Sequence, residues 1–324
     1  MKEKERILVT GAGGFIGWHL ARYLNRKGYW VRGVDIKDPE FQPSQADEFL
    51  LLDLRIMENC EKACKGVDWV FNLAANMGGI GYITRVHAPV MWDNALININ
   101  MIEAARKACV KRYFFSSSAC VYPLYRQKET DVSGLKEHEA IPAEPDTPYG
   151  WEKLFTETLL LAYAEDFGME IRMARFHNIY GPVGTWKGGK EKAPAALCRK
   201  VAMADDLGEI VIWGDGKQTR SFCYIDDCVE GFYRLLLSNY NKPLNIGSDR
   251  MVTIDELADI IIKISQKKIT KKYDPSKPQG VRGRNSDNTL MREVLNWEPK
   301  VELEEGLKIT YEWIKDQVEK ENKK

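Results

Sequence analysis

An eight-residue stretch near the start of the chain, Thr10-Gly11-Ala12-Gly13-Gly14-Phe15-Ile16-Gly17, most strongly restricts how the chain can fold. It follows residues 6–10, which predict a short apolar strand, and leads into residues 15–27, which predict a helix. Glycines at three-residue spacing permit a tight turn, a close approach of the backbone to a pyrophosphate, and close packing of helix on strand. These glycines are Gly11, Gly14 and Gly17. The stretch therefore predicts a dinucleotide-binding turn.

The residues around this turn predict which dinucleotide binds. The N–H groups at the helix start, near Phe15 and Ile16, would bind the phosphates. Asp35, at the end of the next predicted strand, can accept hydrogen bonds from the ribose hydroxyls and would repel a 2′-phosphate. Because the glycine turn has no arginine, NAD is predicted rather than NADP. Lys37 is the one residue that argues against this preference, since its charge could attract a 2′-phosphate. Asp53 follows the third predicted strand and is expected at the adenine end, although an ordinary turn aspartate explains it equally well.

Short apolar runs alternate with amphipathic stretches over the first half of the chain. Such alternation implies right-handed crossovers and a doubly wound parallel Rossmann sheet, so the fold class is α/β. The predicted strands are 6–10, 30–35, 48–52, 69–73, 112–116 and 170–175, and the predicted helices are 15–27, 59–65, 91–108 and 149–167.

The pattern loosens after about residue 178. We expect an NAD-binding domain at 1–178, with segments near 222–247 returning to it, and a smaller α/β substrate-binding lobe over most of 179–324. In this second part the predicted strands are 209–213 and 243–246, and the predicted helices are 193–204, 254–266 and 303–319.

Composition excludes several classes of function. The 47 basic and 47 acidic side chains balance, so neither nucleic acid nor an anionic membrane is expected as a partner. No apolar run approaches the ~18 residues of a membrane span, and the charged residues 1–6 do not resemble a signal peptide. The seven cysteines are scattered without metal-ligand spacing, which predicts reduced thiols, a cytoplasmic location and no metal site.

Candidate catalytic residues follow the predicted strand 112–116. Ser118 and Cys120 lie beyond the carboxyl end of that strand, where open parallel sheets bind ligands. Tyr149 and Lys153 are four residues apart on one face of a predicted helix, so the ammonium can favour the phenolate of the tyrosine. Together with the glycine turn and Asp35, these residues predict a dehydrogenase-type site.

This set of residues resembles the extended short-chain dehydrogenase/reductase family, whose members modify nucleotide sugars. The resemblance extends nearly from end to end and implies that NAD takes a hydride from a sugar carbon, with Tyr149 as the base. Further matching segments are Phe71-Asn72-Leu73-Ala74-Ala75, Asn94, Asn178-Ile179-Tyr180-Gly181-Pro182 and Leu295-Asn296-Trp297-Glu298-Pro299.

Longer segments are most similar to the GDP-mannose 3,5-epimerase branch of that family. This implies that GDP-α-D-mannose is converted to GDP-β-L-galactose and GDP-L-gulose. One position departs from the branch: Asn76 stands where aspartate is expected before Met77-Gly78-Gly79. The matching segments are Ser118–Pro123, Phe176–Pro182, Gly184–Gly189, Glu191–Ala196, Trp213–Gly216, Gln218–Phe222 and Val281–Asn288.

The resemblance also implies roles for individual residues. A ketone at carbon 4 acidifies the protons on carbons 3 and 5, so Cys120 would remove a proton and Lys192 would return one on the opposite face. A thiol has an ordinary pKa of about 8.5, and a nearby cation favours its thiolate. On an extended segment, Ser118 and Cys120 would point to the same side.

Other residues are implied in substrate binding, with two arginines suited to the diphosphate. Taken alone, each of these side chains could equally be an ordinary surface or core residue. The implied substrate-binding residues are Gly78, Ser118, Ala119, Cys120, Asn178, Glu191, Lys192, Ala193, Lys200, Gln218, Thr219, Arg220 and Arg284. By analogy with the family, the long helices 91–108 and 149–167 imply a homodimer.

Rival functions make different demands on the same positions. A 4,6-dehydratase needs an acidic pair where Ala119 and Cys120 stand, and a simple 4-epimerase needs neither a thiol base nor Lys192. A GDP-fucose synthase uses NADPH and a histidine acid, and no histidine follows Gly181-Pro182. A non-catalytic NAD-binding protein has no need for Asn94, Ser118 or the Tyr149–Lys153 pair.

Overall fold

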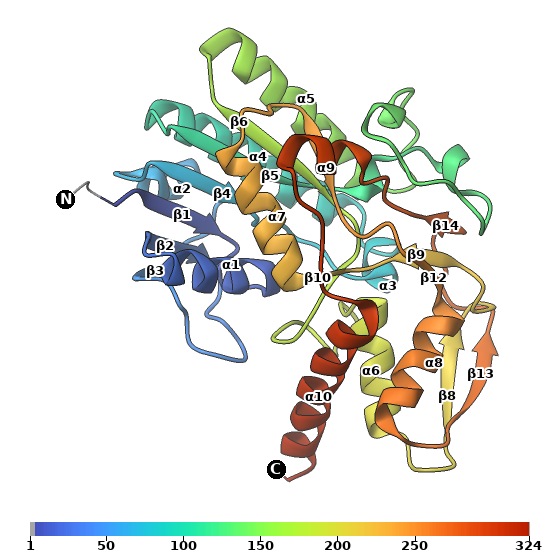
Figure 1. Ribbon diagram of the computed structural model, residues 1–324. Helices are drawn as coiled ribbons and strands as arrows, with labels where there is room; N and C mark the ends of the chain where they lie inside the picture. The colour runs from blue at the N-terminus through green and yellow to red at the C-terminus, as the bar shows by residue number, and fades with distance from the viewer. Residues whose placement is uncertain (1–3, 324) are drawn as a thin grey trace.

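The computed structural model describes residues 4–323, so residues 1–3 of the charged N-terminal stretch lie outside the described residues. Its centre is a seven-stranded sheet in the order β11-β6-β5-β4-β1-β2-β3 (Figure 1). Every neighbouring pair in this sheet is parallel, which confirms the predicted doubly wound α/β class. The strands are β1 Arg6–Thr10, β2 Trp30–Asp35, β3 Glu48–Leu51, β4 Trp69–Asn72, β5 Arg112–Ser118, β6 Ile171–Phe176 and β11 Pro243–Ile246.

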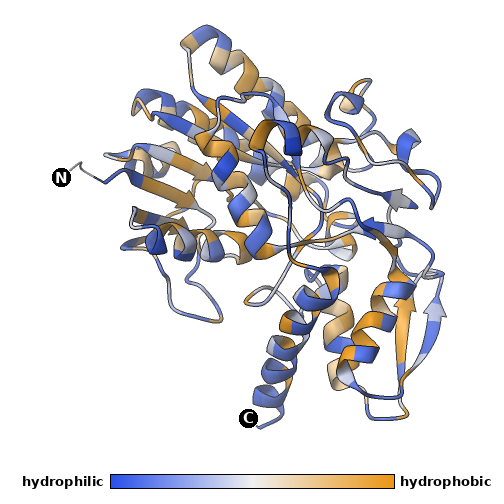
Figure 2. Cartoon of the chain, viewed as in Figure 1, coloured by the Kyte–Doolittle hydropathy of each residue, from blue (hydrophilic) through white to orange (hydrophobic). Residues whose placement is uncertain are grey.

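Two helical layers cover the two faces of the sheet. Helices α2 (Met57–Cys64), α4 (Ala88–Lys107) and α5 (Pro148–Phe167) pack in sequence with one another. Helices α1 (Phe15–Arg26) and α7 (Ile225–Leu237) pack together in the other layer. Side chains alternate between the two faces along each strand, so β1 contributes to both cores. In Figure 2 the middle of the sheet is mostly hydrophobic, as expected for strands buried on both faces.

Helix α7 was not predicted from the sequence. Its apolar residues recur at helical spacing, with Ile225, Val229, Phe232 and Leu236 all buried. Phe232 packs against Phe71, Phe114 and Phe176 from three neighbouring strands. The helix is therefore stabilised by the apolar face of the sheet that it covers.

A smaller group of elements lies to one side of the sheet, at the lower right of Figure 1. A parallel pair, β8 (Glu209–Trp213) and β13 (Thr270–Asp274), lies there with α6 (Ala193–Met203), α8 (Ile254–Ser265) and α10 (Leu303–Asn322). Short strands connect these elements to the sheet: β7 Ile179–Tyr180, β9 Thr219–Ser221, β10 Cys223–Tyr224, β12 Met251–Thr253 and β14 Gly283–Arg284. The remaining elements are α3 Ile80–Ile83, α9 Thr289–Leu295 and the 3₁₀ turns η1 Ala119–Val121, η2 Leu124–Gln127 and η3 Glu137–Ala140.

Strand register brings the predicted site residues to one edge of the sheet. Thr10 pairs with Val34, so the glycine turn and Asp35 leave adjacent strands at the same end. Ser118 pairs with Phe176, which places Cys120 and Asn178 beyond neighbouring strand ends. The strand order reverses between β1 and β4, and such a switch point is where open parallel sheets bind ligands.

No helix within residues 4–323 combines the length and the hydropathy that crossing a membrane requires.

Candidate active site

The glycine turn leaves no space for side chains. A Cβ atom on Gly17 would lie 2.2 Å from the carbonyl oxygen of Gly11, and one on Gly13 would lie 2.4 Å from that of Lys37. Gly11 itself has φ +68°, a conformation that glycine adopts at little cost. Helix α1 begins at Phe15 with no side-chain cap and no acidic residue in its first turn. Its first N–H groups therefore remain available to an anion, and the turn fits the pyrophosphate of a dinucleotide.

Asp35 is fixed beside this turn by backbone amides. Its carboxylate accepts hydrogen bonds from the N–H groups of Gly13 (2.9 Å), Ile36 (2.7 Å) and Lys37 (3.3 Å). Burial raises the pKa of the Asp35 carboxyl, and these amides oppose the shift. The carboxylate thus lies at the end of β2, where a ribose would meet it.

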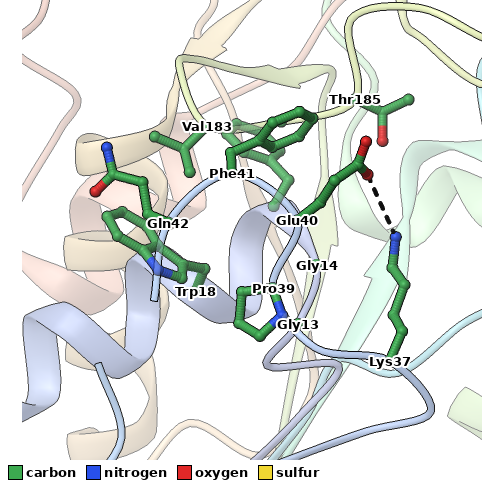
Figure 3. Close-up of a pocket in the computed structure, with 12 residues that line it drawn as sticks. Gly13, Gly14, Trp18, Lys37, Pro39, Glu40, Phe41, Gln42, Val183 and Thr185 are labelled. Carbon is green, nitrogen blue, oxygen red and sulfur yellow. Dashed lines mark ion pairs between the residues drawn. The ribbon is translucent and has the colours of Figure 1, made fainter. Parts of the chain in front are cut away.

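A small pocket lies over the turn (Figure 3), lined by Gly13, Gly14, Phe15, Trp18, Lys37, Pro39, Glu40, Phe41, Gln42, Val183, Gly184 and Thr185. Lys37, the opposing cation, forms an exposed ion pair with Glu40 at 3.8 Å. The loop that follows β2 is anchored by Trp18, whose indole N–H donates to the carbonyl of Pro43 at 2.9 Å. The ammonium of Lys37 is thereby directed to a carboxylate of its own loop.

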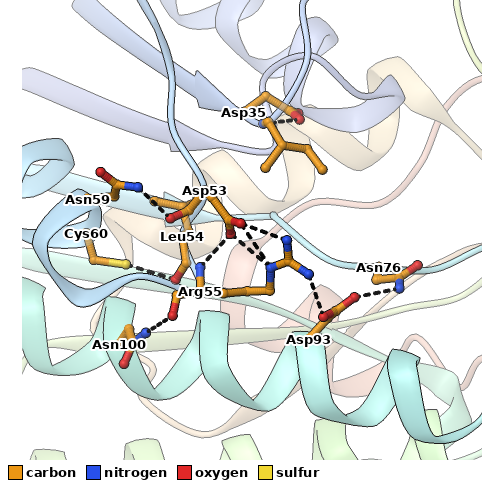
Figure 4. Close-up of polar contacts among 10 residues, drawn as sticks. Asp35, Asp53, Leu54, Arg55, Asn59, Cys60, Asn76, Asp93 and Asn100 are labelled. Atoms are coloured by element: carbon orange, nitrogen blue, oxygen red, sulfur yellow. Dashed lines mark hydrogen bonds and ion pairs between the residues drawn. The ribbon is translucent and has the colours of Figure 1, made fainter.

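Asp53 belongs to a polar network (Figure 4). Its carboxylate forms an ion pair with Arg55 at 2.7 Å, and Arg55 in turn pairs with Asp93 at 2.9 Å. The Asn76 amide donates to Asp93 at 2.9 Å and accepts from the Tyr82 hydroxyl at 2.8 Å. An aspartate at position 76 would place a second carboxylate against Asp93, so the neighbouring charge explains why asparagine fits here.

The segment that carries Cys120 is not extended, and the expectation that Ser118 and Cys120 lie on an extended segment is wrong. Residues 119–121 form the 3₁₀ turn η1. The Ser118 hydroxyl caps this turn by accepting a hydrogen bond from the Cys120 N–H at 3.1 Å. A serine at a helix start favours such a turn over continuation of the strand.

Tyr149 and Lys153 lie in the first turns of α5, buried against the end of β5. Thr147 caps this helix and Pro148 begins it, which fixes where both side chains point. Lys153 Nζ donates to the Ser116 carbonyl at 2.9 Å and lies 5.6 Å from the centre of the Tyr149 ring. Burial raises the pKa of Tyr149, and a hydrogen bond with Ser118 opposes that rise. Ser118, Tyr149 and Lys153 therefore lie close together in the structure.

A series of buried side-chain hydrogen bonds connects this helix to strands β1 and β4. The Thr10 hydroxyl donates to Asn72, the Asn72 amide donates to Asn98, and the Asn98 amide donates to Glu152 at 2.6 Å. These bonds connect the strand before the glycine turn with the residue before Lys153. The two predicted halves of the redox site are thus mechanically linked.

Cys120 is half-buried and faces charged groups from distant segments. The Nη1 atom of Arg284 lies 3.3 Å from its sulfur. Lys192 occupies the N-cap position of α6 without a side-chain cap hydrogen bond, and burial lowers its pKa while the charge of Cys120 opposes the shift. The predicted acid–base residues thus lie within electrostatic reach of one another.

The loop before α6 is locked to the loop after β4. The Gly79 N–H donates to the Lys190 carbonyl at 2.9 Å, and a Cβ on Gly79 would lie 2.2 Å from the Glu191 carbonyl oxygen. The Glu191 carboxylate forms an ion pair with Arg199 at 3.0 Å and so is turned toward α6. Gly78 is buried beside Tyr82, and Ala193 is exposed at the first residue of α6.

The residues expected to bind the nucleotide lie on the side of the smaller group of elements. Lys200 Nζ donates to the Val211 carbonyl at 2.6 Å, and the Gln218 amide donates to the Trp213 carbonyl at 2.9 Å. The Thr219 hydroxyl donates to the Thr130 carbonyl at 2.5 Å. Asn178 adopts a positive φ of 45° and donates to the Ser221 carbonyl at 2.9 Å.

Arg220 and Arg284 lie side by side on the paired strands β9 and β14. Burial lowers the pKa of Arg220 to about 9, and the charge of Arg284 adds to that effect. Arg220 donates only to backbone carbonyls, those of Thr219, Gln279 and Val281. Within the described part of the chain no carboxylate pairs with it, so its charge is available to an anion.

Two residues beside the site were missed by the sequence analysis. Gln127 is fully buried and accepts a hydrogen bond from Arg284 Nε at 2.5 Å. The Asp146 carboxylate lies 3.8 Å from Arg284 Nη2. Neither belongs to a motif with a known spacing, so no signal in the sequence could have identified them. His177, in contrast, is a buried structural residue that hydrogen-bonds Asn245 at 2.9 Å.

Comparison with known proteins places the whole chain in one family. Residues 7–247 match the model of the NAD dependent epimerase/dehydratase family. The chain belongs to this family. Membership confirms the resemblance noted from the sequence, and it confirms NAD as the cofactor of this enzyme. The glycine turn and Asp35 are the residues that would hold it.

Individual relatives align with nearly the whole chain. A protein of Arabidopsis thaliana named GDP-mannose 3,5-epimerase is 54% identical over 324 residues, covering 99% of this chain and 85% of its own length. GDP-L-fucose synthase of Escherichia coli (strain K12) is 29% identical, covering 96% and 97%. A solved UDP-glucose 4-epimerase of Thermotoga maritima, with UDP-glucose, superposes with a TM-score of 0.87 at 30% identity, covering 97% and 99%. The epimerase architecture is therefore shared by almost the entire chain.

Proposed function

We propose that this enzyme epimerises GDP-α-D-mannose at carbons 3 and 5, yielding GDP-β-L-galactose and, when only carbon 5 is inverted, GDP-L-gulose. The 54% identity to the Arabidopsis and Oryza proteins of that name supports the substrate. The observation that carries the reaction type is the presence of two further acid–base groups, Cys120 and Lys192, since Cys120 interacts electrostatically with Lys192, Tyr149 and Lys153. A 4-epimerase needs only the second pair.

The chemistry depends on a transient ketone. NAD, when bound, would accept a hydride from carbon 4 of the sugar and later return it. The ketone at carbon 4 makes the hydrogens on carbons 3 and 5 acidic, because the carbanion formed at either carbon is stabilised as an enolate. A group on one face that removes a proton and a group on the other that supplies one then invert each carbon.

Tyr149 is suited to exchange the proton of the hydroxyl on carbon 4. Its burial stabilises the neutral phenol, whereas the Ser118 hydroxyl and the ammonium of Lys153 stabilise the phenolate. These opposing effects let one side chain both take and return a proton.

Cys120 and Lys192 are suited to the two inversions. The guanidinium of Arg284 at 3.3 Å favours the thiolate of Cys120, which can remove the acidic hydrogen. Burial lowers the pKa of Lys192, so its ammonium gives up a proton more readily than a solvated lysine does.

Arg220 is suited to the diphosphate. It is a largely buried cation that donates only to carbonyls, and guanidinium groups bind phosphate with two parallel hydrogen bonds. Thr219 precedes it on β9, Gln218 lies one residue before that strand, and Lys200 lies on α6.

The decisive experiment follows GDP-mannose and NAD with the enzyme in heavy water by NMR. We expect deuterium at carbons 3 and 5 together with new galactose-type and gulose-type signals. Inversion at carbon 4 alone, with no deuterium at carbons 3 and 5, would reassign the enzyme to the 4-epimerases.

A homodimer is proposed through α4 and α5, which pack together and carry exposed apolar side chains. They include Trp92 (67% exposed), Ile99 (39%), Trp151 (44%) and Phe155 (48%). Light scattering on the native protein and on Trp92→Glu tests this: the native mass should be twice that of one chain, and the variant should dissociate. A cytoplasmic location is proposed from the seven unpaired thiols.

A further inference from the structure

Gln127 connects the segment of Cys120 with the strand of Arg284. It ends η2 and has no exposed surface. Its side-chain amide nitrogen donates to the carbonyls of Tyr122 (3.0 Å) and Pro123 (3.2 Å), just beyond Cys120. Its side-chain oxygen accepts from Arg284 Nε at 2.5 Å. Every polar atom of this buried side chain is thus used, and the two ends of the amide contact two different segments.

The guanidinium of Arg284 is consequently held by its Nε atom. Because the group is planar and rigid, fixing Nε also fixes the direction of the two other nitrogens. Nη1 then lies 3.3 Å from the sulfur of Cys120, and Nη2 lies 3.8 Å from Asp146. Without Gln127 the buried arginine would keep only the distant carboxylate and the thiol as side-chain partners.

We propose that Gln127 is a positioning residue that holds Arg284 against Cys120 and thereby favours the thiolate that removes the substrate proton. This role rests on the proposed function, because it acts through the thiol base. Gln127 does not touch the sulfur, and its effect on Cys120 passes entirely through Arg284.

Several charged or titratable groups face the thiol, and Gln127 contacts one of them. They are Lys192 at the start of α6, Tyr149 and Lys153 on α5, Arg220 on β9, Arg284 on β14, and Asp146, which faces the two arginines from the loop before α5. Among these groups of the described chain, Arg284 is the one within hydrogen-bond distance of the sulfur. It is therefore the cation whose position Gln127 can change at the thiol.

The test is a double-mutant cycle with Gln127→Met, Arg284→Met and the double variant. Methionine matches the length of glutamine and the apolar stem of arginine, but it removes the hydrogen bonds of both side chains. In each protein, iodoacetamide alkylation of Cys120 is measured against pH by mass spectrometry of its peptide, with the exposed Cys109 as internal reference. Thermal unfolding of each variant checks that it is folded.

We expect Gln127→Met to slow alkylation of Cys120 about tenfold at pH 7 and to move its pH profile upward, since a hydrogen bond to a charged group is lost. In the Arg284→Met background the same change should have no further effect. Asn288→Ala removes another buried amide, one that donates to the Gly247 carbonyl, and should leave the Cys120 profile unchanged.

Two results would overturn the proposal. One is equal slowing by Gln127→Met in both backgrounds, which marks a general structural role. The other is a native Cys120 that reacts no faster than Cys109 at pH 7. Absence of deuterium exchange into GDP-mannose by the native enzyme would instead refute the proposed function. The alkylation experiment would still measure whether Gln127 acts on Cys120 through Arg284.

Discussion

The two halves of this site are built in different ways. The proposed NAD-binding edge comes from one βαβ unit and consists of backbone atoms of the glycine turn and one carboxylate, Asp35. The proposed acid–base centre combines Cys120 from the end of β5, Lys192 from the start of α6 and Arg284 from β14. The first is local and steric, whereas the second is assembled from distant segments and depends on charge.

This difference predicts two kinds of failure. A close backbone contact has no room to adjust, so a single methyl group in the glycine turn affects the whole redox step. A cluster of charges still binds ligand after one member is removed, so losses there should concern individual proton transfers. The predictions below test this contrast, beginning with the largest effect.

Gly17→Val should abolish NAD binding, because even a Cβ atom would lie 2.2 Å from the Gly11 carbonyl oxygen and 2.9 Å from Ala12 Cα. We expect affinity for NAD, measured by calorimetry, to fall more than about a thousandfold, a loss of over ~4 kcal/mol. Gly66→Ala is the control, since a Cβ there meets nothing within 4 Å and only the positive φ of 70° is strained. Retained NAD binding by Gly17→Val would show that the turn is not the binding site.

Cys120→Ala should abolish proton exchange while sparing substrate binding. Loss of a general base typically costs about 10²–10⁴-fold. Deuterium incorporation at carbons 3 and 5 should fall by that factor, and the dissociation constant for GDP-mannose should change little. The same substitution at the exposed Cys109 should have no effect. Full exchange by Cys120→Ala would remove the thiol from the mechanism.

Asp35→Asn should weaken NAD binding about tenfold and should reduce the ratio of the affinity for NAD to the affinity for NADP. The substitution keeps an acceptor for the Gly13 N–H but removes the negative charge that repels a 2′-phosphate. Both dissociation constants can be measured by fluorescence titration. Asp38→Asn, exposed in the adjacent loop, is the matched control. An unchanged ratio of the two constants would contradict the role assigned to Asp35.

Two buried histidines, His19 on α1 and His177 directly after β6, report on packing next to the sheet. Burial lowers the pKa of His19 to about 4 and that of His177 to about 3. Between pH 6.5 and these values the unfolded chain binds protons that the folded chain excludes. The free energy of unfolding should therefore fall as pH drops through this window, by roughly 1.4 kcal/mol per pH unit for each histidine.

Denaturant titrations at several pH values measure this slope. His19→Gln should remove about half of the histidine contribution, whereas His138→Gln, at an exposed position, should leave the slope unchanged. Equal slopes for all three proteins would show that His19 is protonated in the folded state.

The local geometry of the predicted site was predictable where it depends on short spacing. The strand–turn–helix unit around the glycines and the placement of Tyr149 and Lys153 one helical turn apart follow from such spacing. Sequence reasoning failed at η1, because the Ser118 hydroxyl can cap a turn as readily as it can end a strand. It also missed α7, whose stability comes from the aromatic face of the sheet against which it packs.

The residue order by itself indicated the α/β class, the strand–turn–helix unit around the glycines and the spacing of Tyr149 and Lys153, since each follows from a sequence pattern within a few tens of residues. Only the tertiary structure decided that Arg284 lies 3.3 Å from the Cys120 sulfur and that Gln127 accepts a hydrogen bond from the same arginine. Such contacts join residues far apart in the chain, and their energies depend on distances of a few ångströms between buried charges. No spacing in a sequence encodes those distances, because packing of the whole sheet sets them.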